Sequence, residues 1–160
     1  MNDIEARLAA LETEVGALRA INDIRAVLSR YAIGVDEKRV EVLREIFADD
    51  AYLGVPAWQA EHHGAGAIMT FFETYWARFD NPRRYYANED IKVEGDNATA
   101  FMYWHVTQDL GDISVLGWGT YDWGFVRRDQ HWLIQREIVH IHAMTTLADG
   151  WAAQREPMQL

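Results

Sequence analysis

The sequence contains no cysteine, and this single absence removes several kinds of chemistry. A chain without thiols forms no disulfide, offers no thiolate to a metal ion and has no cysteine nucleophile. The opening residues 1–7 are charged and lack the apolar stretch of a secretory signal. Together these features predict a cytoplasmic protein.

Basic residues are also scarce, with 15 Lys and Arg against 25 Asp and Glu and a net charge of -10. An acidic surface repels nucleic-acid phosphates and anionic lipids, so we expect neither as a partner. No apolar run approaches the roughly 18 residues of a membrane-spanning helix. Phosphate-binding loops, nucleophile elbows and dinucleotide fingerprints are missing too. A small organic molecule is therefore the expected partner, with no organic cofactor.

Aromatic residues are abundant by contrast: seven Trp, seven Tyr and six Phe in 160 residues. This length suits one domain, and its core does not need seven Trp. Some of the rings are therefore expected to line a cavity or an interface, the alternative being that all of them serve packing.

The first 31 residues follow a helical pattern. Residues 3–31 are predicted to form a helix whose first part carries apolar residues at alternating steps of four and three, typical of a short coiled-coil arm. Packing of the same stripe on its own domain is the alternative. The apolar positions of this arm are Ile4, Leu8, Leu11, Val15 and Leu18.

Two more helices and one short strand are expected before residue 83. Gly34 is predicted to interrupt the first helix, and a second helix to run to Phe47, followed by a polar turn at 48–50. Residues 51–58 read as a strand broken by a proline, and a third helix opens at Gly64.

From Arg83 onward the apolar residues alternate with period two, which is typical of strands. We predict strands at 84–94, 97–109, 112–127 and 131–144, joined by tight turns. Helices followed by antiparallel strands indicate an α+β fold. Three strand glycines allow sharp bends, so that a curved mixed or antiparallel sheet wraps around three helices as a cone. These glycines are Gly117, Gly119 and Gly124.

The domain organisation follows from this order of elements. Residues 1–20 are predicted to form the helical arm, residues 21–148 the cone domain, and residues 149–160 a C-terminal tail.

Asp36 is the first candidate for chemistry. It lies five residues after Tyr31, between apolar helices and near phenols, where a carboxylate gains proton affinity and can act as a general base. The alternative is that Asp36 only caps the second helix.

Two further candidates lie on predicted strands. Alternation allows one Arg and one Tyr of the 83–86 cluster to point inward, with a basic surface patch as the alternative. His105 is in phase with Phe101 and Tyr103 and is a possible proton carrier, although a lone strand histidine more often serves the core.

The remaining histidines do not predict a metal site. His140 and His142 share one face of the last strand, and His62-His63 lie in a loop, but no carboxylate stands at a recognised ligand spacing. The pattern leaves two possibilities for the side chains of the last strand that face the pocket. They are either His140 and His142, or the alternate residues Glu137, Val139 and Ile141. The candidate pocket-lining residues are Tyr85, Tyr86, Tyr52, Trp58, Phe72, Trp76, Tyr103, Trp118, Glu137, Val139 and Ile141.

Five segments carry a resemblance to a known family. They are residues 24–36, 43–51, 64–68, 91–100 and 129–134. Over nearly its whole length the chain resembles the SnoaL-like family, within the cone-shaped superfamily of nuclear transport factor two and ketosteroid isomerase. The similarity is greatest to scytalone dehydratase, hexachlorocyclohexane dehydrochlorinase and bile acid 7-alpha-dehydratase.

This resemblance implies an elimination without metal or cofactor, in which an Asp orients a proton-abstracting His. Asp36 matches that Asp, Tyr31 matches a Tyr of the bile acid enzyme, and Arg84 stands where the His is expected. An arginine is no base at neutral pH, so His105 or Asp36 itself would have to move the proton. The resemblance also implies a homo-oligomer, a trimer rather than a dimer.

The resulting hypothesis is a cofactor-independent lyase, dehydratase or isomerase acting on a hydrophobic, oxygen-bearing steroid, polyketide or aromatic substrate. In it Asp36 is the base, Tyr31 and Tyr85 donate hydrogen bonds, Arg84 clamps an anion and His105 carries a proton. A non-catalytic binding protein of the same fold is the alternative.

Overall fold

The computed structural model describes residues 3–152, so the last eight residues of the predicted tail lie outside the described residues. The helices of the chain come first and four long strands follow. The elements are α1 (Asp3–Asp36), α2 (Val40–Ile46), β1 (Phe47–Val55), the 3-10 helix η1 (Pro56–Trp58), β2 (Ala60–His63), α3 (Ala65–Arg78), β3 (Asp80–Glu94), β4 (Asn97–Leu110), β5 (Ile113–Arg128) and β6 (His131–Thr146).

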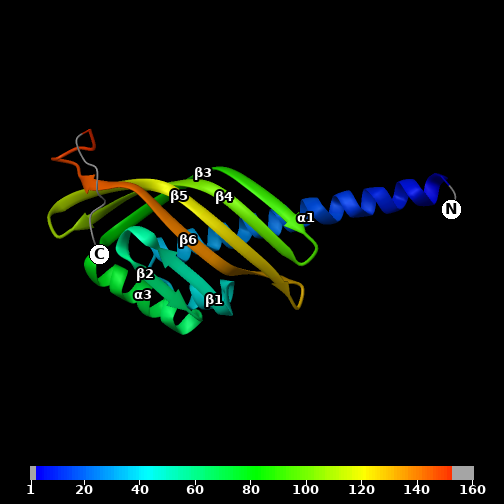
Figure 1. Cartoon of the computed structure of the whole chain (residues 1–160), viewed down its shortest axis with the longest axis horizontal. Helices are drawn as coiled ribbons and strands as arrows, with labels where there is room; N and C mark the ends of the chain where they lie inside the picture. The colour runs from blue at the N-terminus through cyan, green and yellow to red at the C-terminus, as the bar shows by residue number, and fades with distance from the viewer. Residues whose placement is uncertain (1–2, 153–160) are drawn as a thin grey trace.

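The strands form one six-stranded sheet in the order β2-β1-β6-β5-β4-β3. β1 and β6 run parallel, whereas the other neighbours are antiparallel. In Figure 1 the long strands arch over α1 and α3, and the N-terminal part of α1 projects well beyond the sheet. The predicted α+β cone, a curved mixed sheet around three helices with an N-terminal helical arm, is confirmed.

The predicted break of the first helix at Gly34 is wrong, because α1 continues without interruption to Asp36. Gly34 instead allows α2 to pack closely. A Cβ built there would lie 2.6 Å from Cδ2 of Leu43, which is fully buried. The glycine therefore serves helix–helix contact and not chain reversal.

The predicted helix end at Phe47 and turn at 48–50 are also wrong, since these residues belong to β1. Parallel pairing with β6 sets this conformation, with Phe47 opposite Ile134 and Leu53 opposite Glu137. β2, which was not predicted, pairs back onto β1. β1 therefore depends on a neighbour distant in sequence, a context that overrides local propensity, whereas β2 pairs only with β1.

The three predicted hairpin turns are confirmed. Gly95 and Gly111 have φ angles of 61° and 57°, which glycine adopts without steric cost. In the last turn Asp129 and Gln130 both have positive φ, 49° and 67°, as a two-residue hairpin loop requires.

The inner face of the sheet carries the core. Along β4 the buried residues alternate strictly with exposed ones. Met102, Trp104 and Val106 point inward onto α1 and α3 side chains, while Phe101 and Tyr103 point out. Within residues 3–152, no helix combines the length and the apolar character that crossing a bilayer requires.

Gly119 is the tightest point of the sheet, and replacing it should be costly. A Cβ at Gly119 would lie 1.8 Å from the carbonyl oxygen of His140 and 2.9 Å from Cζ2 of Trp104, beside a register shift of β5. We expect Gly119→Ala to lower the free energy of unfolding by about 1–3 kcal/mol or more, measured by urea denaturation.

Gly66 provides the matched control. It lies within α3, where an added Cβ has no described atom within 4 Å. Gly66→Ala should leave stability unchanged or raise it by up to about 1 kcal/mol, because alanine is the better helix former. Equal effects of the two substitutions would contradict the packing assigned to Gly119.

Candidate functional site

A cavity of about 50 Å³ lies between the inner face of the sheet and the helices. Most of its wall is apolar, and this part consists of Val55, Trp58, Phe71, Phe72, Trp104, Val106, Val139, Ile141 and Met144. Its polar groups are one cation, one carboxyl group and three phenols, namely Arg84, Glu137, Tyr31, Tyr75 and Tyr121. A few polar groups in an apolar hollow are typical of a small-molecule site.

Glu137 is the carboxyl group of this cavity. It lies on β6 and is fully buried, with 0% of its surface exposed. Its Oε1 accepts a hydrogen bond of 2.6 Å from the Tyr31 hydroxyl, whereas its Oε2 is buried without a partner among the described residues. Burial raises the pKa of Glu137 to about 8, against the opposing effects of the Tyr31 hydrogen bond and the Arg84 charge. Glu137 is therefore mostly protonated at neutral pH.

Tyr31 comes from α1 and is held by other rings. Its centroid lies 5.0 Å from that of Trp123 and 6.0 Å from that of Phe72, both at steep angles. Burial, followed by the charge of Glu137, raises the pKa of Tyr31 well above its ordinary value. The phenol thus stays protonated and donates its hydrogen bond to Glu137.

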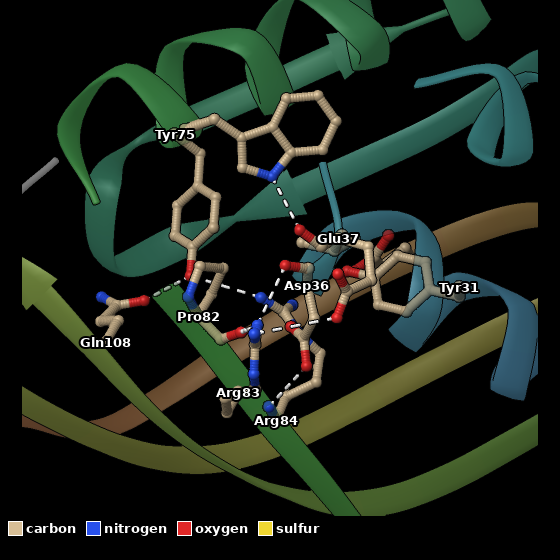
Figure 2. A network of polar contacts seen from close by, with 11 residues as sticks. Tyr31, Asp36, Glu37, Tyr75, Pro82, Arg83, Arg84 and Gln108 are labelled. Atoms are coloured by element: carbon tan, nitrogen blue, oxygen red, sulfur yellow. Dashed lines mark hydrogen bonds and ion pairs between the residues drawn. The ribbon is translucent and has the colours of Figure 1, made fainter. Parts of the chain in front are cut away.

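Asp36 and Arg84 form a second polar unit, which joins the end of α1 to β3 (Figure 2). Asp36 Oδ1 accepts a hydrogen bond of 2.6 Å from Arg84 Nε, and Oδ2 accepts one of 2.8 Å from the Arg84 backbone N–H. Their side chains are 13% and 7% exposed. Both carboxylate oxygens are therefore engaged by one arginine.

The guanidinium of Arg84 connects this pair to the cavity. Its Nη2 donates a hydrogen bond of 3.3 Å to the Tyr75 hydroxyl, which in turn donates a short bond to Gln108 Oε1. Figure 2 shows Tyr75 and Gln108 beyond the guanidinium group, on the side away from Tyr31. Asp36 itself does not line the cavity, so it positions the cation that does.

The capping alternative for Asp36 does not hold. α2 begins at Val40 after Arg39, three residues further on, and no side chain caps it. The free end of α1 is held from outside the helix. Trp76 Nε1 donates a bond of 2.9 Å to the Val35 carbonyl, and Arg83 donates one of 3.2 Å to the Asp36 carbonyl.

The structure brings several of the predicted site residues together. Arg84 turns inward on β3, and Tyr86 packs against Tyr31 and Tyr121 with ring centroids 6.3 and 5.7 Å away. On β6 the side chains of Glu137, Val139 and Ile141 face the cavity, and not those of the two histidines. The predicted residues that line the cavity are Tyr31, Arg84, Trp58, Phe72, Glu137, Val139 and Ile141.

His105 does not reach the cavity, and its predicted place in the pocket is wrong. Strand alternation puts it on the outer face of β4, where its ring stacks on Trp118 with centroids 6.3 Å apart. Tyr103 and Tyr85 also point outward and are 49% and 71% exposed. Tyr103 and His105 flank the inward residue Trp104 on β4, and Tyr85 of β3 pairs with His105, so all three side chains lie on the outer face of the sheet.

Two other predicted lining residues serve other contacts. Tyr52 lies beside His63 at the β1–β2 edge, with ring centroids 5.0 Å apart. Trp76 is committed to the end of α1 through its indole nitrogen. Neither lines the cavity, where β1 presents Val55 and α3 presents Phe72 and Tyr75.

Sequence reasoning missed several wall residues, among them Tyr75, Trp104 and Tyr121. For Trp104 on β4 and Tyr121 on β5, the signal was which alternate set of strand residues is the more apolar. In β4 the set containing Met102, Trp104 and Val106 is more apolar than the set with histidine and threonine, and the more apolar set faces inward.

The histidines of the structure are not arranged around a common point. His140 Nε2 lies 2.8 Å from Asp122 Oδ2 on the outer side of the sheet, and the ring of His62 packs on Phe71 with centroids 4.9 Å apart. In the part of the chain that the structure describes, no three His, Asp or Glu side chains cluster as metal ligands would.

A family model for the SnoaL-like domain matches residues 16–137, which is most of the chain. The chain belongs to the SnoaL-like family. The match runs from the middle of α1 to Glu137, so it contains both the Asp36–Arg84 pair and the buried acid. A search of curated protein sequences found no significant match to this SnoaL-like protein.

Solved structures show the same fold for this SnoaL-like chain. Hexachlorocyclohexane dehydrochlorinase LinA-type3 from Novosphingobium barchaimii LL02 is 23% identical, with a TM-score of 0.76 over 86% of this chain and 96% of that one. A protein assigned as a scytalone dehydratase from Novosphingobium aromaticivorans DSM 12444 is 18% identical, with a TM-score of 0.74 over 88% and 94%. At such identities the likeness establishes the fold alone.

Proposed function

We propose that this protein is a cofactor-independent lyase or isomerase that moves a proton on a small hydrophobic, oxygen-bearing substrate. The observation that carries the proposal is the Glu137 carboxyl group, which is buried at the cavity with Oε2 unpartnered among the described residues. Its pKa of about 8 is suited to proton transfer near neutral pH.

The reaction uses the carboxylate form of Glu137 as the base. Its Oε2 takes a proton from a carbon next to a substrate carbonyl, and the electron pair of the C–H bond moves onto the carbonyl oxygen. The Arg84 cation and the phenols at the cavity stabilise that oxyanion. In an elimination, the oxyanion re-forms the carbonyl, its electron pair makes a C=C bond to the adjacent carbon, and the C–O bond of a hydroxyl group on that carbon breaks. The departing hydroxyl group takes the proton from Glu137 and leaves as water. In an isomerisation, Glu137 returns the proton to another carbon.

Asp36 is a positioning residue in this proposal and not the base. Both of its carboxylate oxygens bind Arg84, and the carboxylate lies off the cavity wall. The pair holds the guanidinium against Tyr75, where it meets the cavity. The proton-transfer role therefore moves from Asp36 to Glu137, while Tyr31 tunes the acid through its hydrogen bond.

The size of the cavity bears on the substrate class. About 50 Å³ is well below the roughly 150 Å³ of an engineered cavity that holds benzene. Even a single ring therefore needs more room than the cavity offers, and among steroid, polyketide and aromatic substrates a compact, single-ring molecule requires the least enlargement. We expect the enlargement at Trp58, which is only half-buried on the short helix η1, and a polycyclic substrate requires a larger movement there.

Deuterium exchange tests this proposal without knowledge of the physiological substrate. Single-ring β-hydroxy ketones and cyclic enones are incubated in D₂O with the protein, and NMR follows deuterium at the α-carbon, loss of water and double-bond shift. We expect exchange with the native protein and none above background with Glu137→Gln. Equal exchange by the two proteins would remove Glu137 as the base.

A binding protein without turnover is the second candidate. Arg84 favours it, because this residue cannot accept a proton at neutral pH and stands where the family resemblance implies a histidine. Its signature would be a ligand retained in native mass spectrometry and returned unchanged, with no deuterium at carbon. Rapid conversion of the retained ligand would contradict it.

A further inference from the structure

The first part of α1 is an apolar helix surface in water. Residues 3–19 are all exposed, and this arm projects past the end of the sheet (Figure 1). Leu8, Leu11, Val15 and Leu18 are 56%, 57%, 42% and 60% exposed, and Ile4 is 70% exposed. A continuous row of large apolar side chains marks an interaction site.

The row does not face the domain to which the helix belongs. From Ala20 onward α1 buries a different stripe, which includes Ile24, Leu28 and Tyr31. Because successive helical residues are about 100° apart, the arm stripe lies about 180° around the helix from this buried stripe. One helix thus presents one face to its own domain and the opposite face to solvent, so the domain does not obstruct a partner on the arm.

The spacing of the row is that of a coiled-coil seam. Leu8 and Val15 occupy a positions, whereas Leu11 and Leu18 occupy d positions, as does Ile4. The next three seam positions are polar: Asn22, Arg25 and Ser29. The seam therefore ends where the domain begins.

The charges beside the seam specify the partner and its direction. Arg7 and Glu14 are at g positions, and Glu12 and Arg19 are at e positions. In a parallel, in-register pair each g residue faces the e residue five positions further along the partner helix. Arg7 then meets Glu12 of the second copy, and Glu14 meets its Arg19. Both contacts are attractive and occur twice in a symmetric pair.

The antiparallel alternative fits these charges poorly. An antiparallel pair centred on Leu11 and Val15 brings Glu12 of one helix against Glu12 of the other. Nor do the two glutamates support their own helix, since neither Glu12 nor Glu14 has a basic residue three or four positions away. The charge arrangement therefore favours a parallel seam over an antiparallel one.

We propose that residues 4–18 form a parallel, in-register coiled coil with the same segment of a second copy of this chain. Two heptads would be marginal in isolation, but here the fold nucleates the helix because α1 is anchored from residue 20 onward. This coiled coil would be one contact between the chains of the predicted homo-oligomer. The total number of chains stays a prediction.

Site-specific cross-linking tests the register. The chain has no cysteine, so one introduced cysteine reports on its own position alone. In the full-length protein Leu11→Cys places two thiols opposite each other at a d layer, whereas Thr13→Cys places them on the outer face of the helix. We expect at least about tenfold more disulfide-linked dimer from Leu11→Cys under mild oxidation. Equal yields, or no dimer from either variant, would overturn the proposal.

Charge reversal tests direction and partner. Arg7→Glu or Glu12→Arg alone should lower the yield of the Leu11→Cys dimer by about two- to fivefold, because like charges then face each other. The double reversal Arg7→Glu/Glu12→Arg should restore it. The two residues are five positions apart within one helix and do not touch there, so rescue reports contact between copies. Failure of the double variant to recover would contradict a parallel seam.

Discussion

Replacing Glu137 with glutamine is expected to make the protein more resistant to alkaline pH than the native chain. Glu137 has an ordinary pKa of 4.5 in the unfolded chain and of about 8 in the fold, where burial disfavours its charge. As pH rises from about 4.5 to 8, the unfolded chain has released this proton and the folded chain still holds it. Folding then binds a proton, so the free energy of unfolding falls as pH rises.

The size of this loss is on the order of a few kcal/mol once pH exceeds about 8. Glutamine carries no titrating proton, so the variant lacks this contribution while all other groups remain. Urea denaturation of both proteins at pH 6 and pH 9 measures it. The stability of Glu137→Gln minus that of the native protein should increase with pH. Glu61→Gln, at an exposed glutamate of β2, is the control and should follow the native protein.

The same substitution should remove the proposed activity. Because the carboxylate is the reactive form, kcat/KM of the native protein should rise about tenfold per pH unit and level off above about pH 8. Glu137→Gln should lower the plateau value above about pH 8 by about 10²- to 10⁴-fold and abolish the rise with pH. Loss of activity without the stability change would mean that the carboxyl group is not buried as described.

Tyr31→Phe separates tuning from proton transfer. The Tyr31 hydrogen bond lowers the pKa of Glu137, and removing it should move the inflection of the pH profile to higher pH while activity persists. Tyr121, Tyr86 and Arg84 also surround these two groups, so they stay unchanged in this comparison. If the inflection did not move, Glu137 would not be the group that titrates in the pH profile.

Local patterns in the sequence predict the parts of this fold that local physics determines. Period-two alternation and turn residues locate β3 to β6, because each hairpin is closed by neighbours in sequence. The predicted strand at 51–58 overlaps the second half of β1, but the first half escapes prediction because its conformation depends on pairing with β6, about 90 residues away for Phe47 and Ile134. β2 was missed as well, and it pairs only with β1. A polar stretch such as 48–50 reads as a turn until that partner is known.

The site was harder to predict, because it depends on which face of each strand points inward. A shift of one residue reverses every side chain, and β5 pairs with β6 through register shifts at Trp118/Gly119 and Gly124/Phe125. Alternation offered either the histidines or Glu137 on the last strand as inner residues. Asp36 and Arg84 could be named as candidates, but their direct pairing across α1 and β3 follows only from three-dimensional packing.

Replacing Arg84 with methionine is expected to destabilise the protein by about 3–5 kcal/mol. Methionine keeps much of the side-chain volume but leaves the Asp36 carboxylate, which is 13% exposed, without its cation. The lost interactions include the 2.6 Å bond from Nε, whereas the backbone bond to Oδ2 remains. Most of the cost arises from a charge left in a poorly solvated place.

The double variant Arg84→Met/Asp36→Asn distinguishes this cause from lost packing. It removes both charges together, so it should be more stable than Arg84→Met alone despite carrying an additional change. Denaturant unfolding of the four proteins in this cycle gives the coupling energy. A double variant as unstable as the sum of the singles would show that the ion pair contributes nothing beyond its separate residues.

A second ion pair between the same two elements is the control for this cycle. Arg25 of α1 lies 3.0 Å from Glu89 of β3, but the side chains are 56% and 34% exposed. Arg25→Met should therefore cost about 0–1 kcal/mol.

The double variant Arg84→Met/Asp36→Asn also tests the role of Arg84 in the proposed reaction. It retains Glu137 and the fold but lacks a cation at the cavity, so it should exchange substrate protons far more slowly than the native protein does. Unimpaired exchange would leave Arg84 a purely structural role.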